Sequence, residues 1–256
     1  MDWNEAVRKL YICLNLKRRA VGIKFCRSRD DFEKAPGICP LRPMNYCQAV
    51  AAASYGNGIR LKRESFKCSG GLRALGICRD DPRNLHGENW ARLGMYEAGV
   101  CRTVREKMDF LEDEAFGVAA APAESFDRTP DVVIVIGTPY VMMRISQAYA
   151  YHYGMPENLR FAGNQAFCAE CTSRPYKTGD LNFSMLCIGT RHQAGWDDTE
   201  AAAGISGRIA ENVADGLWKT VNIMESDENK ARIEAAARAQ GFDIRIRYHY
   251  NYYMDC

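Results

Sequence analysis

The sequence predicts an α/β fold on three observations. Residues 131–137 (DVVIVIG) form a continuous apolar run, which is typical of a strand buried on both faces. Residues 139–153 follow with apolar side chains at helical spacing, and a strand followed by a helix is the signature of an α/β domain. Residues 2–16 also repeat apolar side chains every three or four positions, which predicts an amphipathic helix at the start of the chain.

The other elements are expected between and after these three. Their predicted ranges are strands at 20–25, 115–121 and 181–188, and helices at 44–55, 97–111, 206–224 and 227–240. Pro43 stands where a helix tolerates proline best, so Cys47 is expected in the first turn of a helix, where the macrodipole stabilises a thiolate. The last segment, IRIRYHYNYY, alternates in polarity and predicts a strand or an extended arm, through which we expect a homodimer.

Composition excludes several classes of protein. The 256 residues carry a formal net charge of +2, with 47% hydrophobic and 26% charged residues, as in soluble globular proteins. This charge gives no reason to expect nucleic acid or a membrane as a partner. No secretory signal and no run of ~18 apolar residues are visible, so we expect a cytoplasmic protein whose thiols stay reduced. The eleven cysteines therefore need an explanation other than disulfides.

An internal repeat aligns four of these cysteines. Cys47 and Cys168 are each followed by tyrosine after eight residues and by glycine after eleven. Each stretch then reaches a second cysteine, Cys68 or Cys187, which is followed by glycine two positions later and then by arginine. We therefore expect one compact domain, residues 1–256, made of two similar strand-helix halves packed about a pseudo-twofold axis. The halves are expected at about 18–110 and 130–220, followed by a C-terminal helix and arm at 227–256.

If the two halves face that axis, the four repeated cysteines converge on one point. Four thiolates are the ligand set of a [4Fe–4S] cluster or of a structural zinc ion. Structural zinc sites mostly use cysteines two to four residues apart, and here only Cys168 and Cys171 are so spaced, which favours the cluster. Cys39 and Cys171 are reserve ligands. A metallo-tetrapyrrole in a cysteine-lined pocket, a coincidental repeat, and a scaffold that merely buries its thiols are the remaining alternatives.

Glycines and arginines near the second cysteines extend this hypothesis. Gly70, Gly71 and Gly189 would let backbone N–H groups approach the cluster, and Arg73 and Arg191 would offset its negative charge or hold a carboxylate or phosphate. We therefore expect electron transfer or reduction of a small anionic molecule, with a redox protein as a further partner. The sequence contains no G-x-G-x-x-G, Walker A or H-E-x-x-H motif, so it leaves the reaction and the substrate open.

Four segments carry a family resemblance. They are CQAV from Cys47, CSGGLRALG from Cys68, PDVVIVIGTP from Pro130 and SMLCIGTR ending at Arg191. With them the chain resembles domain-of-unknown-function family 169 over roughly residues 18–220. That family occurs largely in anaerobic bacteria and archaea, so the resemblance implies a setting that suits an oxygen-sensitive cluster. It implies no particular activity.

Overall fold

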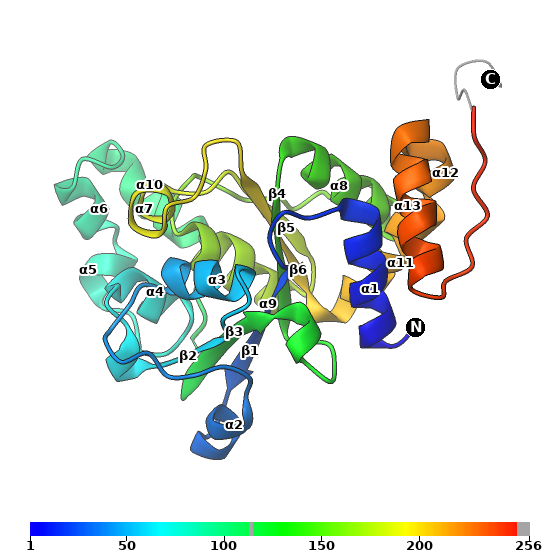
Figure 1. The fold of residues 1–256 in the computed structure, drawn as a ribbon. Coiled ribbons are helices and arrows are strands. Elements are labelled where there is room, and N and C mark those ends of the chain that lie inside the picture. Colours follow the sequence, from blue (N-terminus) through cyan, green and yellow to red (C-terminus); the bar gives the residue numbers. More distant parts are fainter. Residues whose placement is uncertain (113–114, 250–256) are drawn as a thin grey trace.

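The computed structural model describes residues 1–112 and 115–249, and these form a mixed α/β fold around one six-stranded sheet (Figure 1). The strand order is β2-β3-β1-β4-β6-β5, and every neighbouring pair is antiparallel. The strands are β1 (Val21–Cys26), β2 (Ile59–Lys62), β3 (Gly117–Pro122), β4 (Val132–Gly137), β5 (Leu181–Ser184) and β6 (Ala201–Ser206).

Helices cover both faces of the sheet. The layer on one face, here called the first layer, consists of α1 (Trp3–Leu14), α8 (Pro139–Tyr153) and α11 (Gly207–Lys219), flanked by α12 (Val221–Met224) and α13 (Asp227–Ala239). The second layer, on the other face, consists of α3 (Tyr46–Ser54), α4 (Ser69–Ala74), the π-helix η3 (Ala166–Ser173), α9 (Arg174–Thr178) and α10 (Ile188–Ala194).

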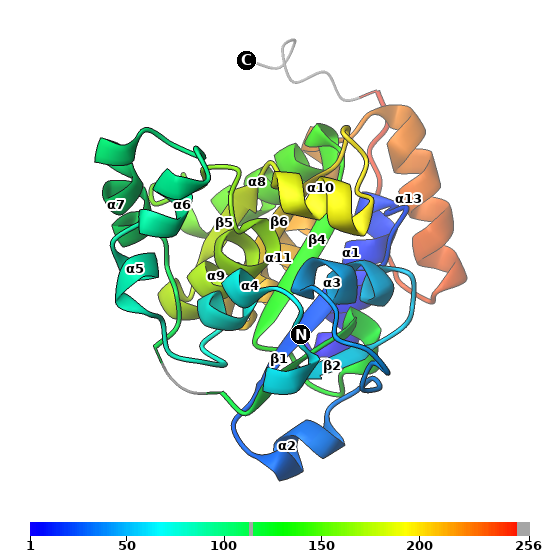
Figure 2. The ribbon, with the colours of Figure 1, turned by 90° about the vertical axis from the view of Figure 1, so that its left-hand side faces the viewer.

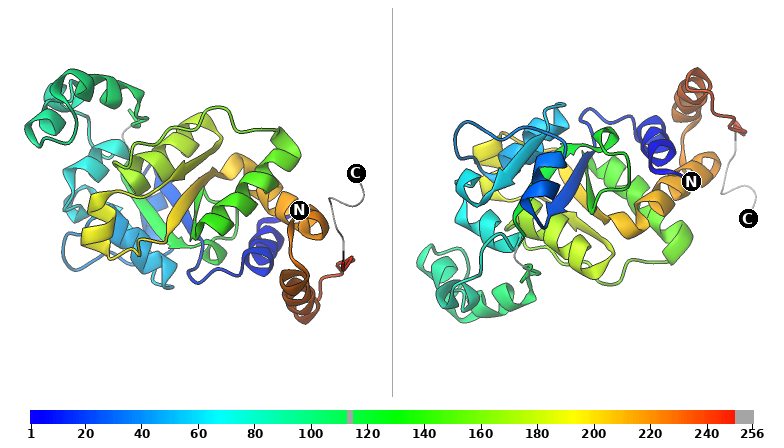
Figure 3. Two further views of the ribbon diagram at one scale, coloured as in Figure 1. Left: turned by 90° about the horizontal axis from the view of Figure 1, so that it is seen from above. Right: turned by 90° about the horizontal axis from the view of Figure 1, so that it is seen from below.

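The remaining helices lie at the ends of the sheet. They are α2 (Arg29–Lys34), α5 (Pro82–Leu85), α6 (Glu88–Arg92), α7 (Ala98–Lys107) and the short 3₁₀ turns η1 (Arg63–Ser65) and η2 (Ala123–Ser125). Helices α5, α6 and α7 form a lobe at the end of the molecule opposite α13 (Figure 3).

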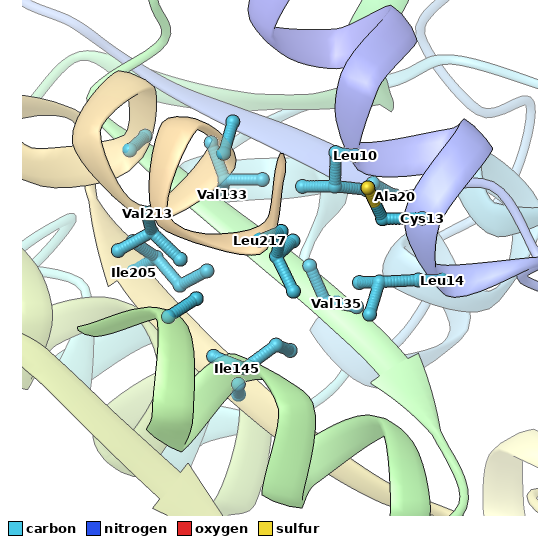
Figure 4. Packing of buried hydrophobic residues seen from close by; sticks show 14 of the residues in the cluster. Leu10, Cys13, Leu14, Ala20, Val133, Val135, Ile145, Ile205, Val213 and Leu217 are labelled. Atoms are coloured by element: carbon cyan, nitrogen blue, oxygen red, sulfur yellow. The ribbon is translucent and has the colours of Figure 1, made fainter. Parts of the chain in front are cut away.

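The central strand β4 explains why the sheet is covered on both faces. Val133 and Val135 pack into the first layer, whereas Val132, Ile134 and Ile136 pack into the second. A strand buried on both faces needs a continuous apolar run rather than alternation, which is what residues 131–137 provide. Figure 4 shows the first-layer side, where the valines of β4 lie among side chains of α1, α8 and α11.

Two glycines let helices approach their neighbours closely. A Cβ atom at Gly204 of β6 would lie 2.2 Å from the carbonyl oxygen of Cys171, so η3 sits directly on the sheet. A Cβ atom at Gly216 of α11 would lie 2.2 Å from the carbonyl oxygen of Ala148, so α11 packs tightly on α8. Because such contacts leave no room for a side chain, both positions need glycine.

The predicted α/β class is confirmed, as are the helices at 2–16, 44–55, 139–153 and 227–240. The strand predicted at 181–188 was too long, because β5 ends at Ser184 and Cys187 caps α10. Strands β2 and β6 were not predicted from the sequence. Residues 241–249 form no strand, and the rest of the predicted arm lies outside the described residues. No helix of the described residues is long and apolar enough to cross a membrane.

Candidate functional site

A cavity of about 590 Å³ lies in the second layer, and the four repeated cysteines all contribute to its wall. Cys47 comes from α3, Cys68 from the start of α4, Cys168 from η3 and Cys187 from the start of α10. Figure 2 shows the side of the molecule on which α3, α4 and α10 lie together. The structure therefore brings together the four residues that the repeat singled out, and the cavity they line is called the cysteine cavity below.

Each of the four cysteines stands at the beginning of a helix. Cys68 and Cys187 are the N-cap residues of α4 and α10, and Cys47 is the second residue of α3, where Asn45 and Gln48 form a capping box. Cys168 is the third residue of η3. Unpaired N–H groups give a helix start a partial positive charge within the first turn, but at Cys47 and Cys168 burial outweighs it and the thiol pKa is raised. The prediction that Cys47 lies in a first helical turn is confirmed.

Three of the four sulfur atoms already have polar partners. The Sγ of Cys68 accepts a hydrogen bond from the backbone N–H of Gly71 at 3.5 Å, and the Sγ of Cys187 lies 3.1 Å from the hydroxyl of Thr190. The thiol of Cys168 donates to Oε1 of Gln165 at 2.9 Å. Gly71 and Thr190 can donate to a thiolate as they stand, whereas Gln165 would have to turn its amide to present its N–H groups.

Burial and neighbouring sulfurs oppose the ionisation of Cys47 and Cys168. Burial, the largest cause, together with Cys187 and Cys68 raises the pKa of Cys47 to about 12. Burial also raises the pKa of Cys168 well above its ordinary value, and Cys68, Cys187 and Cys47 add to that effect. Because like charges so close together oppose each other, the four sulfurs would become thiolates together only beside a compensating cation.

The four cysteines reach the cavity from four different elements. Among the described residues, no three His, Cys, Asp or Glu side chains are placed to share one metal ion. A single zinc ion would hold its thiolates about 2.3 Å away. The structure brings the four cysteines to one cavity, and their convergence on one point stays a prediction.

Two arginines carry the formal charges that line the cavity among the described residues, and one of them is paired with aspartates. In the part of the chain that the structure describes, Arg73 and Arg92 line the cavity and no Asp or Glu does. Arg73 forms ion pairs with Asp81 at 2.7 Å and with Asp80 at 3.6 Å. Arg92, at the end of α6, is exposed and forms no hydrogen bond or ion pair with any described residue. The wall also carries six amide side chains, from Asn45, Asn84, Asn89, Asn164, Gln165 and Gln193.

The predicted glycines all line the cysteine cavity. A Cβ atom at Gly189 would lie 4.0 Å from the Sγ of Cys187, and one at Gly70 would lie 2.6 Å from Nε2 of Gln165. At Gly71 it would lie 3.4 Å from the Cβ of Tyr46. Only the contact at Gly70 is too close for a side chain, whereas those at Gly71 and Gly189 are ordinary van der Waals distances.

Arg191, Cys171 and Cys39 lie elsewhere. The guanidinium of Arg191 donates to the carbonyl oxygens of Met185 at 2.9 Å and Glu200 at 3.2 Å, and it does not line the cavity. Cys171 is fully buried against β6, and Cys39 is exposed on a loop; neither lines the cavity. Of the two arginines that the repeat matched, Arg73 alone therefore stands at the cavity.

Sequence reasoning missed Glu170 and Gln165. Glu170 is buried and accepts hydrogen bonds from the N–H of Ala162 at 2.7 Å and from the hydroxyl of Ser184. Burial raises its pKa, and these hydrogen bonds partly offset the rise. Glu170 thus anchors the segment before η3, from which Gln165, with φ at 57°, reaches the cavity. A glutamate between two cysteines was the only local signal of this arrangement.

The α5–α7 lobe was also missing from the predicted site. Asn84, Asn89, Trp90 and Arg92 line the cavity from α5 and α6, and Leu93 follows directly after α6. The second half of the chain has no comparable lobe, because α10 is followed by β6 with no further helix between them.

Comparison with known proteins gives two similarities. The model of the DUF169 family, described as Uncharacterised ArCR, matches residues 9–216. Uncharacterized protein MJ0308 of Methanocaldococcus jannaschii is 25% identical over 230 residues, which cover 85% of this chain and 95% of that protein. No solved structure matches the chain.

Proposed function

The chain belongs to the DUF169 family, and we propose that it binds a [4Fe–4S] cluster through Cys47, Cys68, Cys168 and Cys187. The observation that carries the proposal is that these four cysteines line a single cavity. In a [4Fe–4S] cluster each thiolate binds a different iron, so its ligands surround a space instead of meeting at one ion. Four cysteines that line one cavity supply the donor set of such a cluster, and the wide sequence spacing of the four favours it over structural zinc.

The electrostatics of the cavity support an anionic guest. A cluster held by four thiolates is negatively charged, and the wall has two arginines, four helix starts and, among the described residues, no carboxylate. The Gly71 N–H and the Thr190 hydroxyl are placed to donate to cysteine sulfurs, and such hydrogen bonds tune the potential of a cluster.

The proposal includes an origin by internal duplication, with halves related by a pseudo-twofold axis. In its support, exchanging β1, β2 and β3 for β4, β5 and β6 reverses the strand order and leaves it otherwise unchanged. The inner pairs β1–β3 and β4–β6 each join six residues to six, and the outer pairs β2–β3 and β5–β6 each join four to four. The axis would pass between Gly22 and Val133, the middle of the three pairs that join β1 to β4.

The function that follows is one-electron transfer. When bound, the cluster would supply an electron-transfer centre whose irons are all held by the protein. The chain's own residues would hold the sulfurs, offset the negative charge and limit the access of solvent. Such a centre would serve as an electron carrier or as the electron source for the reduction of a small anionic molecule near Arg73 and Arg92.

Anaerobic purification, followed by reconstitution with ferrous iron and sulfide, tests the proposal. We expect about four iron and four sulfide per chain and a broad absorption near the visible-ultraviolet boundary. The variant Cys39→Ser, outside the cavity, should retain the same iron content. Protein that stays colourless and free of iron would overturn the proposal. Stoichiometric zinc, or a Soret-like band from a tetrapyrrole, would overturn it in favour of those alternatives.

A further inference from the structure

We propose that the mouth of the cysteine cavity is a docking surface for a small acidic protein that carries a one-electron redox group. The inference rests on the proposed function, because it names the partner of the same site. The docking surface is defined by five exposed residues: Arg92, Leu93 and Ile188, which line the cavity, and Arg42 and Lys67, which lie close in sequence to lining residues.

Large apolar side chains stand in solvent at the mouth of the cavity. Leu93 and Ile188 both line it, yet they are 69% and 65% exposed. Leu93 follows α6 directly, and Ile188 begins α10 directly after Cys187. The mouth therefore lies between the α5–α7 lobe and α10. Solvent-exposed apolar side chains on both sides of it favour an interaction surface.

One cation lines this mouth, and two more lie close in sequence to residues that line the cavity. Arg92 lies beside Leu93, Lys67 precedes Cys68, and Arg42 lies three residues before Asn45, which lines the cavity. The loops that carry Arg42 and Lys67 are joined, because the N–H of Lys67 donates to the carbonyl of Met44 at 2.9 Å. All three cations are exposed, and within the described residues none of them forms an ion pair.

The distribution of charge along the chain points the same way. Residues 59–107 contain eleven Lys and Arg and six Asp and Glu, a net charge of +5, whereas the whole chain carries +2. The rest of the chain is therefore net negative. Within this segment Asp80 is already paired with Arg105 at 2.5 Å, and Asp81 with Arg73. The side of the molecule that bears Cys68 and the α5–α7 lobe should attract acidic partners.

A protein fits this surface better than a small anion. A small anion at Arg92 would leave Leu93 and Ile188 exposed, whereas the core of a protein interface covers such side chains. A cluster whose irons are all bound by cysteine exchanges electrons without binding its partner's atoms, so close approach is sufficient. Interfaces between electron-transfer proteins are small, often below about 1,200 Å², so a few exposed residues around the mouth form a large part of one.

Two redox proteins of opposite charge serve as probes: an acidic plant-type [2Fe–2S] ferredoxin and a basic cytochrome c. Binding is measured by calorimetry on the protein both before and after cluster reconstitution, and electron transfer by stopped flow at low and high salt. We expect ferredoxin to bind, and to bind about tenfold more weakly to the variant Arg42→Glu/Lys67→Glu/Arg92→Glu at low ionic strength. Salt should reduce this difference, since it screens exposed charges. The basic cytochrome c should not show this loss of affinity in the triple variant.

A matched control changes the net charge equally on other surfaces. The variant Lys34→Glu/Arg128→Glu/Arg238→Glu replaces three exposed cations outside the cavity, and its ferredoxin affinity should change less than about twofold. Equal weakening in the two triple variants, or no ferredoxin binding to the wild type, would overturn the docking surface. If Arg92→Glu binds ferredoxin as tightly as the wild type but no longer binds a small anion such as inorganic phosphate, the docking surface would be overturned in favour of a small ligand. Protein that binds ferredoxin through these residues but never retains iron would support the surface while refuting the cluster.

Discussion

The two helical layers of this protein bury different kinds of group. The first layer packs α1, α8 and α11 into an apolar core that also buries the ion pair of Arg144 and Glu225, and a cavity of about 590 Å³ lies at its edge beside Cys13 and Val141. The second layer packs α3 and η3 on the same sheet, but the cysteine cavity interrupts it. The layers therefore differ in chemistry: the cavity of the second layer is lined by four thiols, whereas the first layer buries an ion pair.

The ion pair in the first layer offers the largest expected effect on stability. The side chains of Arg144 and Glu225 are 0% and 1% exposed, and Nε lies 2.5 Å from Oε1. Replacing Glu225 by alanine leaves the guanidinium buried without its partner, so the free energy of unfolding should fall by about 3–5 kcal/mol in urea denaturation. The double variant Arg144→Met/Glu225→Leu should lose much less, because it buries no unpaired charge. A smaller loss in the single variant than in the double would contradict this account of the first layer.

Alanine substitutions at two comparable glycines, one in each layer, test the comparison between the layers. Gly204 and Gly216 each stand 2.2 Å, measured from an added Cβ, from a helix carbonyl oxygen, but Gly204 faces η3 and Gly216 faces α8. Alanine at either position should cost about 1–3 kcal/mol through overpacking. Gly204→Ala should also lower the iron content, because it displaces η3 and with it Cys168, whereas Gly216→Ala should retain iron. Equal iron content in the two variants would show that the seating of η3 does not control the site.

How much of this could be predicted depends on where the determining contacts lie. Strand β4 and helix α8 were predictable because the local pattern of apolar residues indicates their burial. Strand β6 (AAAGIS) was not, because alanine and glycine are weak strand formers and its place depends on pairing with β4 and β5. The overlong strand at 181–188 failed at Leu186, whose φ of 63° ends the extended chain.

The site divides in the same way. Cysteines at repeated spacings were visible in the sequence, but the roles of the two arginines differ for reasons of tertiary structure. Arg73 lines the cavity, whereas Arg191 donates hydrogen bonds to the carbonyl oxygens of Met185 and Glu200. Arg92 belongs to the α5–α7 lobe, and nothing in its local sequence connects it with the cysteines.

The smallest stability effect concerns a cysteine of the first layer. Burial raises the pKa of Cys13 to about 12 from its ordinary value of 9. Between these values the unfolded chain loses the thiol proton and the folded chain keeps it, so the free energy of unfolding should fall as pH rises from 9 toward 12. Cys13→Ala should cost about 1 kcal/mol at neutral pH and should flatten this part of the pH profile. Denaturation curves at several pH values provide the measurement, and identical profiles for the two proteins would contradict the assignment of Cys13 as a buried structural thiol.

The most direct test of the central claim is the iron and acid-labile sulfide content of four single variants, Cys47→Ser, Cys68→Ser, Cys168→Ser and Cys187→Ser, after identical anaerobic reconstitution. The account predicts about four iron and four sulfide per chain in the wild type and in Cys39→Ser, and loss of most of both in each of the four variants. The loss should be similar for the two halves of the chain, because each contributes two ligands to one cavity. Wild-type iron and sulfide content in any of the four variants would contradict the claim that these cysteines together hold a single cluster.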